Sequence, residues 1–162
     1  MAIAELPSEV GGPATVLLVS SNGGHLAQLI ALRAWWSVRR RTWVTFDTPD
    51  ATSRLEGETV VAAHHPTTRN VGNLLRNGLL AWSVLRRVRP ELVVSTGAGV
   101  AIPFFVIARL HAIPTVYIEV YDRVDSRTMT GRLCRPFATR FLVQSEAQQV
   151  LYLDSTVLGR LV

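Results

Sequence analysis

The sequence TVLLVSSNGGHLAQLIAL, residues 15–32, decides the fold. Its first six residues form an apolar run with several β-branched side chains, which is typical of a buried strand. Gly23 and Gly24 then permit a tight turn, and the apolar residues that follow recur at helical spacing: Leu26, Leu29, Ile30 and Leu32. The stretch therefore predicts a strand, a glycine-rich turn and a helix in succession.

The same alternation continues along the chain. Further strands are predicted at residues 42–46, 59–63, 92–95, 115–119 and 141–143. Helices are predicted at residues 70–89, 100–110 and 128–135, with short ones after Thr48 and Ser145. Strands that alternate with helices indicate an α/β fold, a Rossmann-like doubly wound parallel sheet covered on both faces.

In this fold class, ligands bind beyond the carboxyl ends of the strands, where the strand order reverses. Two glycine-rich turns each lead from a strand into a helix, SNGGH at residues 21–25 and STGAG at residues 95–99. If the first and fourth strands are neighbours, these turns face one another across a crevice.

The length and composition predict a single domain. The 162 residues are enough for one core, so residues 14–162 are expected to form one domain after a flexible leader of residues 1–13. The first ten residues hold two glutamates and no basic residue, which excludes a signal peptide, and no stretch is apolar enough to span a bilayer. The lone Cys134 indicates a cytoplasmic protein.

The basic residues are all arginine, and they are unevenly placed. Seventeen basic residues stand against 12 acidic ones, with no acidic residue between Glu9 and Asp47 or between Glu58 and Glu91. Basic and aromatic surfaces attract phosphate groups of nucleic acids or anionic lipids, although a solvated helix face with incidental tryptophans is the simpler alternative. The residues considered for membrane contact are Trp35, Trp36, Arg76, Trp82, Arg86 and Arg87.

The two glycine-rich turns are suited to hold phosphate. Glycines let the backbone approach a ligand, and the first turn of a helix presents unpaired N–H groups with a partial positive charge. A single turn of this kind could merely permit a change of direction, whereas two at related positions favour a binding site.

His25 lies on the first turn of the predicted helix. The positive end of the helix favours the neutral imidazole, which can accept a proton as a general base. The alternative is a histidine that simply hydrogen-bonds in the crevice. His64 and His65 have no suitably spaced carboxylate or cysteine, so no metal site is expected.

Glu119 ends the otherwise apolar strand PTVYIE at the edge where sites form. It is either a catalytic or hydroxyl-binding group, or one partner of an ion pair with Arg123 or Arg127. A nicotinamide-binding oxidoreductase is a weaker possibility. Asp47 stands where a ribose-binding acid would, but the first turn lacks the pattern G-x-G-x-x-G.

The two glycine turns, together with the segment PTVYIEVYDRVDSRTMTGRL and the later FLVQS, resemble the PssD-like family of bacterial polysaccharide glycosyltransferase subunits. Eukaryotic relatives of that family are the membrane-recruiting subunits of the transferase that adds the second N-acetylglucosamine to dolichol diphosphate. More distantly, the chain is similar to the N-terminal half of MurG. The resemblance runs from about Val16 to Leu161.

The resemblance implies the N-terminal, acceptor half of a GT-B fold, with a separate PssE-like subunit binding the nucleotide-sugar donor. The acceptor would be a polyprenyl-diphosphate-linked sugar, and no cofactor, metal or nucleic acid would be needed. His25, or else Glu119, would take the proton from the attacking hydroxyl. The residues expected to hold the acceptor are Asn22, Gly23, Gly24, Thr96, Gly97, Gly99 and Arg123.

The resemblance also favours peripheral attachment to the cytoplasmic face of the membrane through basic amphipathic segments such as residues 70–89. Two hypotheses thus lead. The chain is either a subunit of a polysaccharide-forming glycosyltransferase that takes part in catalysis, or a non-catalytic module that recruits a transferase to the membrane.

Overall fold

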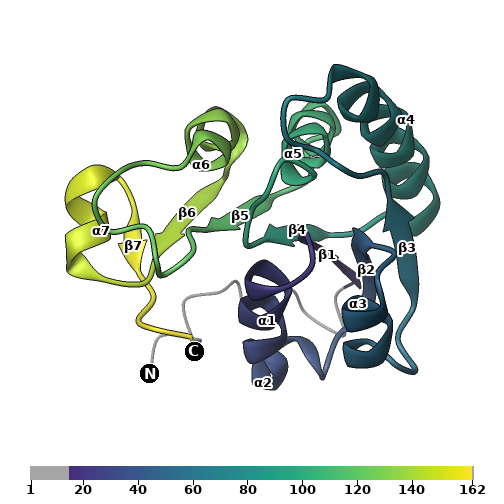
Figure 1. Cartoon of the computed structure of the whole chain (residues 1–162), viewed down its shortest axis with the longest axis horizontal. Coiled ribbons are helices and arrows are strands. Elements are labelled where there is room, and N and C mark those ends of the chain that lie inside the picture. The colour runs from purple at the N-terminus through teal and green to yellow at the C-terminus, as the bar shows by residue number, and fades with distance from the viewer. Residues whose placement is uncertain (1–14, 162) are drawn as a thin grey trace.

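The computed structural model describes residues 15–161, which form a seven-stranded parallel sheet in the order β3-β2-β1-β4-β5-β6-β7 (Figure 1). The strands are β1 (Thr15–Val19), β2 (Arg40–Phe46), β3 (Val60–Ala63), β4 (Leu92–Ser95), β5 (Thr115–Ile118), β6 (Arg140–Val143) and β7 (Thr156–Val157). The helices are α1 (Gly24–Ala31), α2 (Arg33–Trp36), α3 (Pro49–Arg54), α4 (Val71–Val88), α5 (Ala101–Leu110), α6 (Met129–Cys134) and α7 (Glu146–Leu151). The predicted leader falls outside the described residues.

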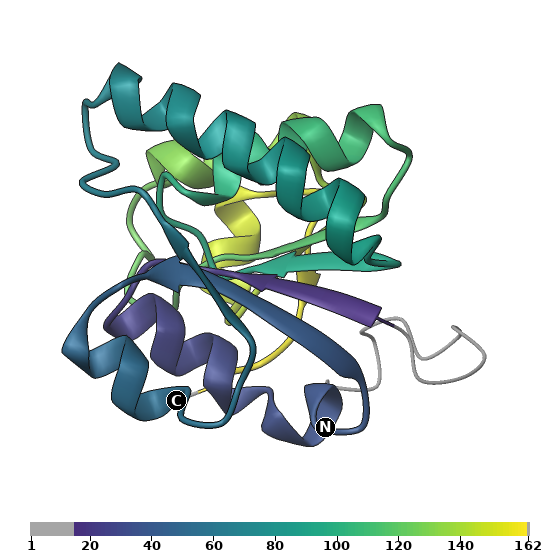
Figure 2. The same ribbon diagram turned by 90° about the vertical axis from the view of Figure 1, so that its right-hand side faces the viewer.

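Helices cover both faces of the sheet. Seen edge-on, the sheet separates α4 and α5 from α1, α2 and α3 (Figure 2). Each face has its own buried apolar cluster, one containing Phe104, Phe105 and Tyr117, the other containing Leu26, Leu29 and Trp43. The Rossmann-like, doubly wound fold predicted from the sequence is confirmed.

Side chains at the helix starts explain why the helices begin where they do. The hydroxyl of Thr48 accepts a hydrogen bond from the backbone of Ala51, with proline in the first turn of α3. Asn70, Thr128 and Ser145 cap α4, α6 and α7 in the same way. The helix predicted at residues 70–89 therefore forms with nearly the expected bounds.

The predicted adjacency of the first and fourth strands is confirmed. β1 lies between β2 and β4, and Val19 is in register with Ser95. Both glycine-rich turns therefore leave the same edge of the sheet side by side. The sequence patterns missed α2, a 3₁₀ turn at Arg135–Phe137, and the two-residue edge strand β7, which is too short to show a periodic pattern.

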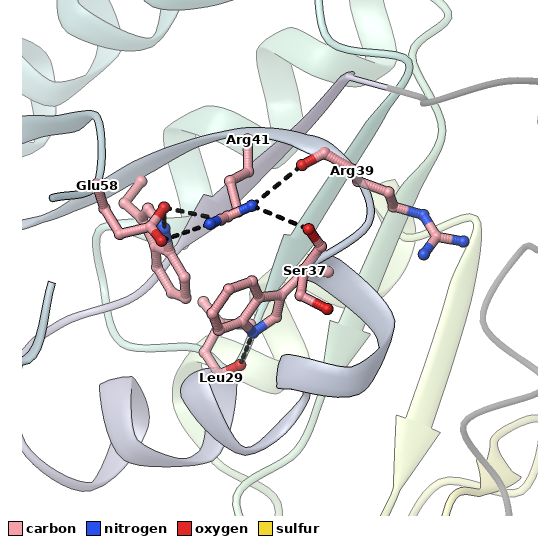
Figure 3. Close-up of polar contacts among 7 residues, drawn as sticks. Leu29, Ser37, Arg39, Arg41 and Glu58 are labelled. Carbon is pink, nitrogen blue, oxygen red and sulfur yellow. Dashed lines mark hydrogen bonds and ion pairs between the residues drawn. The ribbon is translucent and has the colours of Figure 1, made fainter.

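The predicted membrane contact of Trp35 and Trp36 is wrong, because both side chains are buried at 5% exposure. With Leu32 they form a stripe spaced three and four residues apart, which turns inward on α2. The Trp36 indole donates a hydrogen bond to the carbonyl of Leu29 at 3.1 Å and meets Trp43 edge-on, with 5.4 Å between ring centroids (Figure 3).

Arg41 is the centre of the polar contacts around these tryptophans (Figure 3). Its guanidinium donates to both carboxylate oxygens of Glu58, at 2.6 and 2.7 Å, and lies 4.7 Å from the centroid of the Trp36 ring. The Trp43 indole donates to the same carboxylate at 3.0 Å. These donors, Arg41 first, hold the pKa of Glu58 below its ordinary value, although partial burial opposes them.

On α4, by contrast, the predicted surface residues Arg76, Trp82, Arg86 and Arg87 are all exposed. Arg86 lies over the Trp82 ring at 5.7 Å from its centroid. Within residues 15–161, no helix has the length and apolar character needed to cross a bilayer.

Candidate functional site

A cavity of about 430 Å³ lies at the carboxyl ends of β1, β4 and β5. Its size is within the range of small-molecule sites. Three predicted site residues, Gly24, His25 and Arg123, line it together with residues from the second glycine turn and from the loop after β5. The other lining residues are Gln28, Ala98, Tyr117, Val120, Tyr121, Asp122, Thr128 and Thr130.

The first glycine turn brings unpaired N–H groups to the cavity. Gly23 precedes α1 with φ of 63°, a conformation that glycine tolerates best, and no side chain caps the helix. An uncapped helix start of this kind is suited to bind an anion.

The second turn is built as tightly as the first. Gly97 has φ of 105°, and its amide donates to the Ser95 hydroxyl at 2.9 Å. A Cβ at this position would stand 2.7 Å from the Tyr117 hydroxyl, so a side chain does not fit. Ala98 is held at φ of 65°, an unfavourable conformation for a residue with a side chain, and it lines the cavity.

His25 joins the two turns. Its Nδ1 lies 2.8 Å from the carbonyl oxygen of Thr96, and the Thr96 hydroxyl donates to the carbonyl of His25 at 2.7 Å. Since a carbonyl oxygen only accepts hydrogen bonds, Nδ1 carries the hydrogen. In the neutral ring, Nε2 then holds the lone pair. This arrangement fixes the tautomer that a general base requires.

Glu119 lies beneath the cavity and is not among the residues of its wall. It is only 1% exposed. One carboxylate oxygen accepts hydrogen bonds from the hydroxyls of Thr128, at 2.8 Å, and Tyr152, at 2.6 Å; the other accepts from the amide of Val120 at 3.1 Å. Glu119 is thus buried, hydrogen-bonded through both oxygens and outside the cavity wall, so His25 is the better placed of the two candidate bases.

The predicted ion pair of Glu119 is also absent from the described part of the chain, where hydroxyl groups take the place of Arg123 and Arg127. Burial raises the pKa of Tyr117 well above its ordinary value, and the charge of Glu119 adds to the shift. Tyr117, which lines the cavity, therefore remains a neutral phenol at physiological pH.

Three buried glutamines, which the sequence analysis did not single out, position the loop after β5. Gln144 donates to the side chain of Gln28 at 2.5 Å. Gln148 donates to the backbone carbonyls of Val120, at 2.6 Å, and Arg123, at 3.2 Å. The loop that carries Arg123 is therefore held by buried hydrogen bonds although its own side chains are exposed.

Gly131 is a further position that sequence reasoning missed. A Cβ there would stand 2.5 Å from a carboxylate oxygen of Glu119 and 2.7 Å from the Tyr152 hydroxyl. Only a glycine at this position of α6 leaves room for the buried hydrogen bonds between Glu119, Thr128 and Tyr152. Nothing in the sequence marked Gly131, because its neighbours come from strands and helices that are distant along the chain.

The remaining predicted residues lie around the cavity without lining it. Asn22 is exposed at the first turn, and Gly99 packs so closely against Thr67 that an added Cβ would be 3.0 Å away. Within residues 15–161, no group of three or more metal-binding side chains is placed to hold an ion.

Comparison with known proteins shows the family of the chain. The family described as "Oligosaccharide biosynthesis protein Alg14 like" matches residues 62–161. The human protein named UDP-N-acetylglucosamine transferase subunit ALG14 is 26% identical over 91% of this chain and 83% of its own length. The Tolumonas auensis protein named UDP-N-acetylglucosamine--N-acetylmuramyl-(pentapeptide) pyrophosphoryl-undecaprenol N-acetylglucosamine transferase is 30% identical over 89% of this chain and 43% of its own length.

Solved structures with the same fold are about twice as long as this chain. MurG of Acinetobacter baumannii aligns with a TM-score of 0.69 and 17% identity, over 83% of this chain and 43% of MurG. The Staphylococcus aureus MnaA–UDP structure aligns with a TM-score of 0.72 and 9% identity, over 91% and 45%. At these identities the likeness shows the fold, and this chain matches less than half of each of these two proteins.

Proposed function

From the premise that the chain belongs to the Alg14-like family of oligosaccharide biosynthesis proteins, we propose that it is the acceptor-binding, membrane-associated subunit of a split GT-B glycosyltransferase. The complete enzyme would transfer a sugar from a nucleotide-sugar to a polyprenyl-diphosphate-linked sugar in polysaccharide or glycan synthesis. The observation that carries this proposal is the cavity between the two glycine turns, with His25 bonded across them.

The acceptor diphosphate would bind at the two turns. The uncapped start of α1 and the turn at Ala98 offer backbone N–H groups, and Arg123 adds a full positive charge to the same cavity. Backbone donors fixed by tight turns bind a phosphate without losing side-chain entropy. This supports the predicted role of Gly24 in acceptor binding, while Gly23 and Gly97 shape the two turns through their positive φ angles.

His25 would act as the general base. As the acceptor hydroxyl attacks, a bond forms between its oxygen and the anomeric carbon of the donor sugar, and the bond from that carbon to the nucleoside diphosphate breaks. Nε2 of His25 takes the hydroxyl proton, while the Nδ1 contact with Thr96 keeps the ring in place. Glu119 would serve as a positioning residue through Thr128 and Tyr152.

The donor would bind mainly to a second, PssE-like subunit. GT-B enzymes place their active site between two Rossmann-like domains, and the described residues form one such domain, matching less than half of MurG. The nucleotide-sugar is then a substrate and no cofactor is needed. The proposed location is the cytoplasmic face of the membrane, with α4 as the peripheral contact.

The decisive test replaces His25 by alanine in the complex with the donor-binding partner. Transfer of radiolabelled sugar from UDP-N-acetylglucosamine to a lipid-linked acceptor should fall at least about 100-fold, the usual loss when a general base is removed. The variant should still fold, because His25 is partly exposed and makes its side-chain hydrogen bond at the surface of the cavity.

Gly57→Ala provides a control away from the site, where an added Cβ meets no neighbour but a φ of 80° makes the substitution mildly unfavourable. It should lose stability without losing transfer. Near-normal transfer by the His25→Ala variant would contradict the proposed base. It would instead favour the non-catalytic module that recruits the transferase to the membrane.

A further inference from the structure

The two carboxylates nearest the cavity differ in what they are free to bind. Glu119 is buried and both of its oxygens already accept hydrogen bonds. Asp122, three residues later, is exposed and lines the cavity. Among residues 15–161, no side chain forms an ion pair with Asp122 and no donor reaches it. Asp122 is therefore the carboxylate that can accept hydrogen bonds from a ligand.

The neighbours of Asp122 in the cavity wall are hydroxyl groups and an aromatic ring. Thr130 is partly exposed with its hydroxyl available, whereas Tyr117 lines the cavity but is only 1% exposed. The Thr128 hydroxyl is already used, since it donates to Glu119 and accepts from the amide of Gly131. This set of groups suits a ligand with several hydroxyls, which both donate and accept hydrogen bonds.

Asp122 and the first glycine turn lie on opposite sides of β4 at the edge of the sheet. The glycine turns follow β1 and β4, whereas Asp122 follows β5 on the far side of β4. A carboxylate repels a diphosphate at close range and accepts hydrogen bonds from neutral hydroxyls. The glycine turns and Arg123 are therefore suited to phosphate, whereas Asp122 is suited to neutral hydroxyl groups.

A cation is a poor alternative occupant of this wall. The described residues contain no cluster of acidic or metal-binding side chains, and Arg123 beside Asp122 contributes positive charge to the same cavity. One carboxylate next to an arginine does not make a metal site, because hard cations need several oxygen ligands.

We propose that Asp122, with Thr130, binds the hydroxyl groups of the sugar that the acceptor diphosphate carries, and so determines which acceptor sugar is used. This inference rests on the proposed function, since it concerns the same acceptor. Asp122 holds the sugar by its hydroxyls and has no part in proton transfer, which remains with His25.

The test compares two soluble probes that differ only in the sugar: citronellyl diphosphate, and the same compound carrying N-acetylglucosamine. Each is titrated into the chain of residues 1–162, and binding is followed by amide chemical shifts. Asp122→Asn should lower the affinity for the sugar-bearing probe about tenfold, the usual loss for a hydrogen bond to a charged group. It should change the affinity for citronellyl diphosphate less than about twofold, since the phosphate end is unchanged.

Asp125→Asn is the matched control, an exposed carboxylate in the same loop that does not line the cavity. It should leave both affinities unchanged. Thr130→Val, which keeps the side-chain shape, should lower only the affinity for the sugar-bearing probe. Equal effects of Asp122→Asn on both probes, or none on either, would overturn the inference while leaving the proposed function intact. Failure of the wild-type chain to bind either probe at millimolar concentration would overturn the proposed function itself.

Discussion

Two segments, residues 33–43 and α4, have similar compositions, but the fold uses them in opposite ways. Both contain arginines and tryptophan and lack acidic residues. In the first segment Trp35, Trp36 and Trp43 are buried, whereas Trp82 on α4 is 46% exposed. Composition alone therefore does not decide whether a basic, aromatic segment forms a surface.

The difference comes from which stripe of each helix faces the sheet. α4 buries Asn73, Asn77 and Ala81 in its first three turns and exposes larger apolar side chains. Asn77 both donates to and accepts from the backbone of His64, at 2.9 and 2.8 Å, so these asparagines are needed inside to hold the loop before α4. The apolar side chains left outside are Val71, Leu74, Leu75, Leu79 and Trp82.

The largest expected effect is the loss of a buried tryptophan. Trp43→Ala should lower the free energy of unfolding by about 3–5 kcal/mol, because it removes a fully buried ring and leaves a cavity beside Trp36. Urea denaturation followed by circular dichroism measures the change.

Trp82→Ala on α4 is the matched variant and should cost less than about 1 kcal/mol, since its ring is half exposed. If the two substitutions destabilise the chain equally, the contrast between the segments is incorrect. Near-neutral behaviour of Trp43→Ala would contradict the inward packing of the first segment.

The next effect concerns the exposed stripe of α4. The double variant Leu75→Ser, Leu79→Ser should reduce flotation with phosphatidylglycerol vesicles at least about tenfold, because each leucine buried in the interface contributes apolar free energy. Its stability should change by less than about 0.5 kcal/mol, as is usual for surface sites.

Val38→Ser tests whether the effect belongs to α4. Val38 is 70% exposed and lies in the first basic segment, beyond α2. Its replacement should leave vesicle binding unchanged. Absence of wild-type flotation on these vesicles would contradict the peripheral contact, and equal losses in both variants would show that binding does not depend on α4.

Much of this contrast and of the fold follows from the sequence. Apolar runs and caps such as Asn70 predict the strands and helices, because those patterns are local. The burial of Trp36 could not be read in this way, because its partner Trp43 lies on another element. The same holds for Asn77, which has a polar side chain but is buried to hold a loop.

The candidate site likewise has a part that local sequence patterns predict and a part that depends on distant contacts. The glycine turns and His25 are identifiable because a turn between strand and helix is a local pattern. The network beneath them is non-local: Gln28 and Gln144 are 116 residues apart, and Glu119 and Tyr152 are 33 apart. The position of Glu119 at a strand end suggested a catalytic role. Only the fold shows that its carboxylate is buried and accepts hydrogen bonds at both oxygens.

The smallest expected effect on stability comes from the ion pair of Arg41, which the arginines of α4 lack within residues 15–161. Arg41 is paired with Glu58, which has a lowered pKa. Glu58→Gln should cost about 1 kcal/mol at pH 7, within the range for a partly exposed ion pair with good geometry.

The pH dependence of that cost gives the sharper test. Because the folded state lowers the pKa of Glu58, its contribution to stability is complete above the unfolded value of about 4.3 and is lost as the pH falls through the folded value. The difference in unfolding free energy between wild type and Glu58→Gln should therefore shrink as the pH is lowered below the unfolded pKa. Glu56→Gln, at an exposed neighbouring carboxylate, should show no such trend. A difference that stays constant from pH 7 to pH 3 would mean that Glu58 acts through packing with Trp43 and not through its charge.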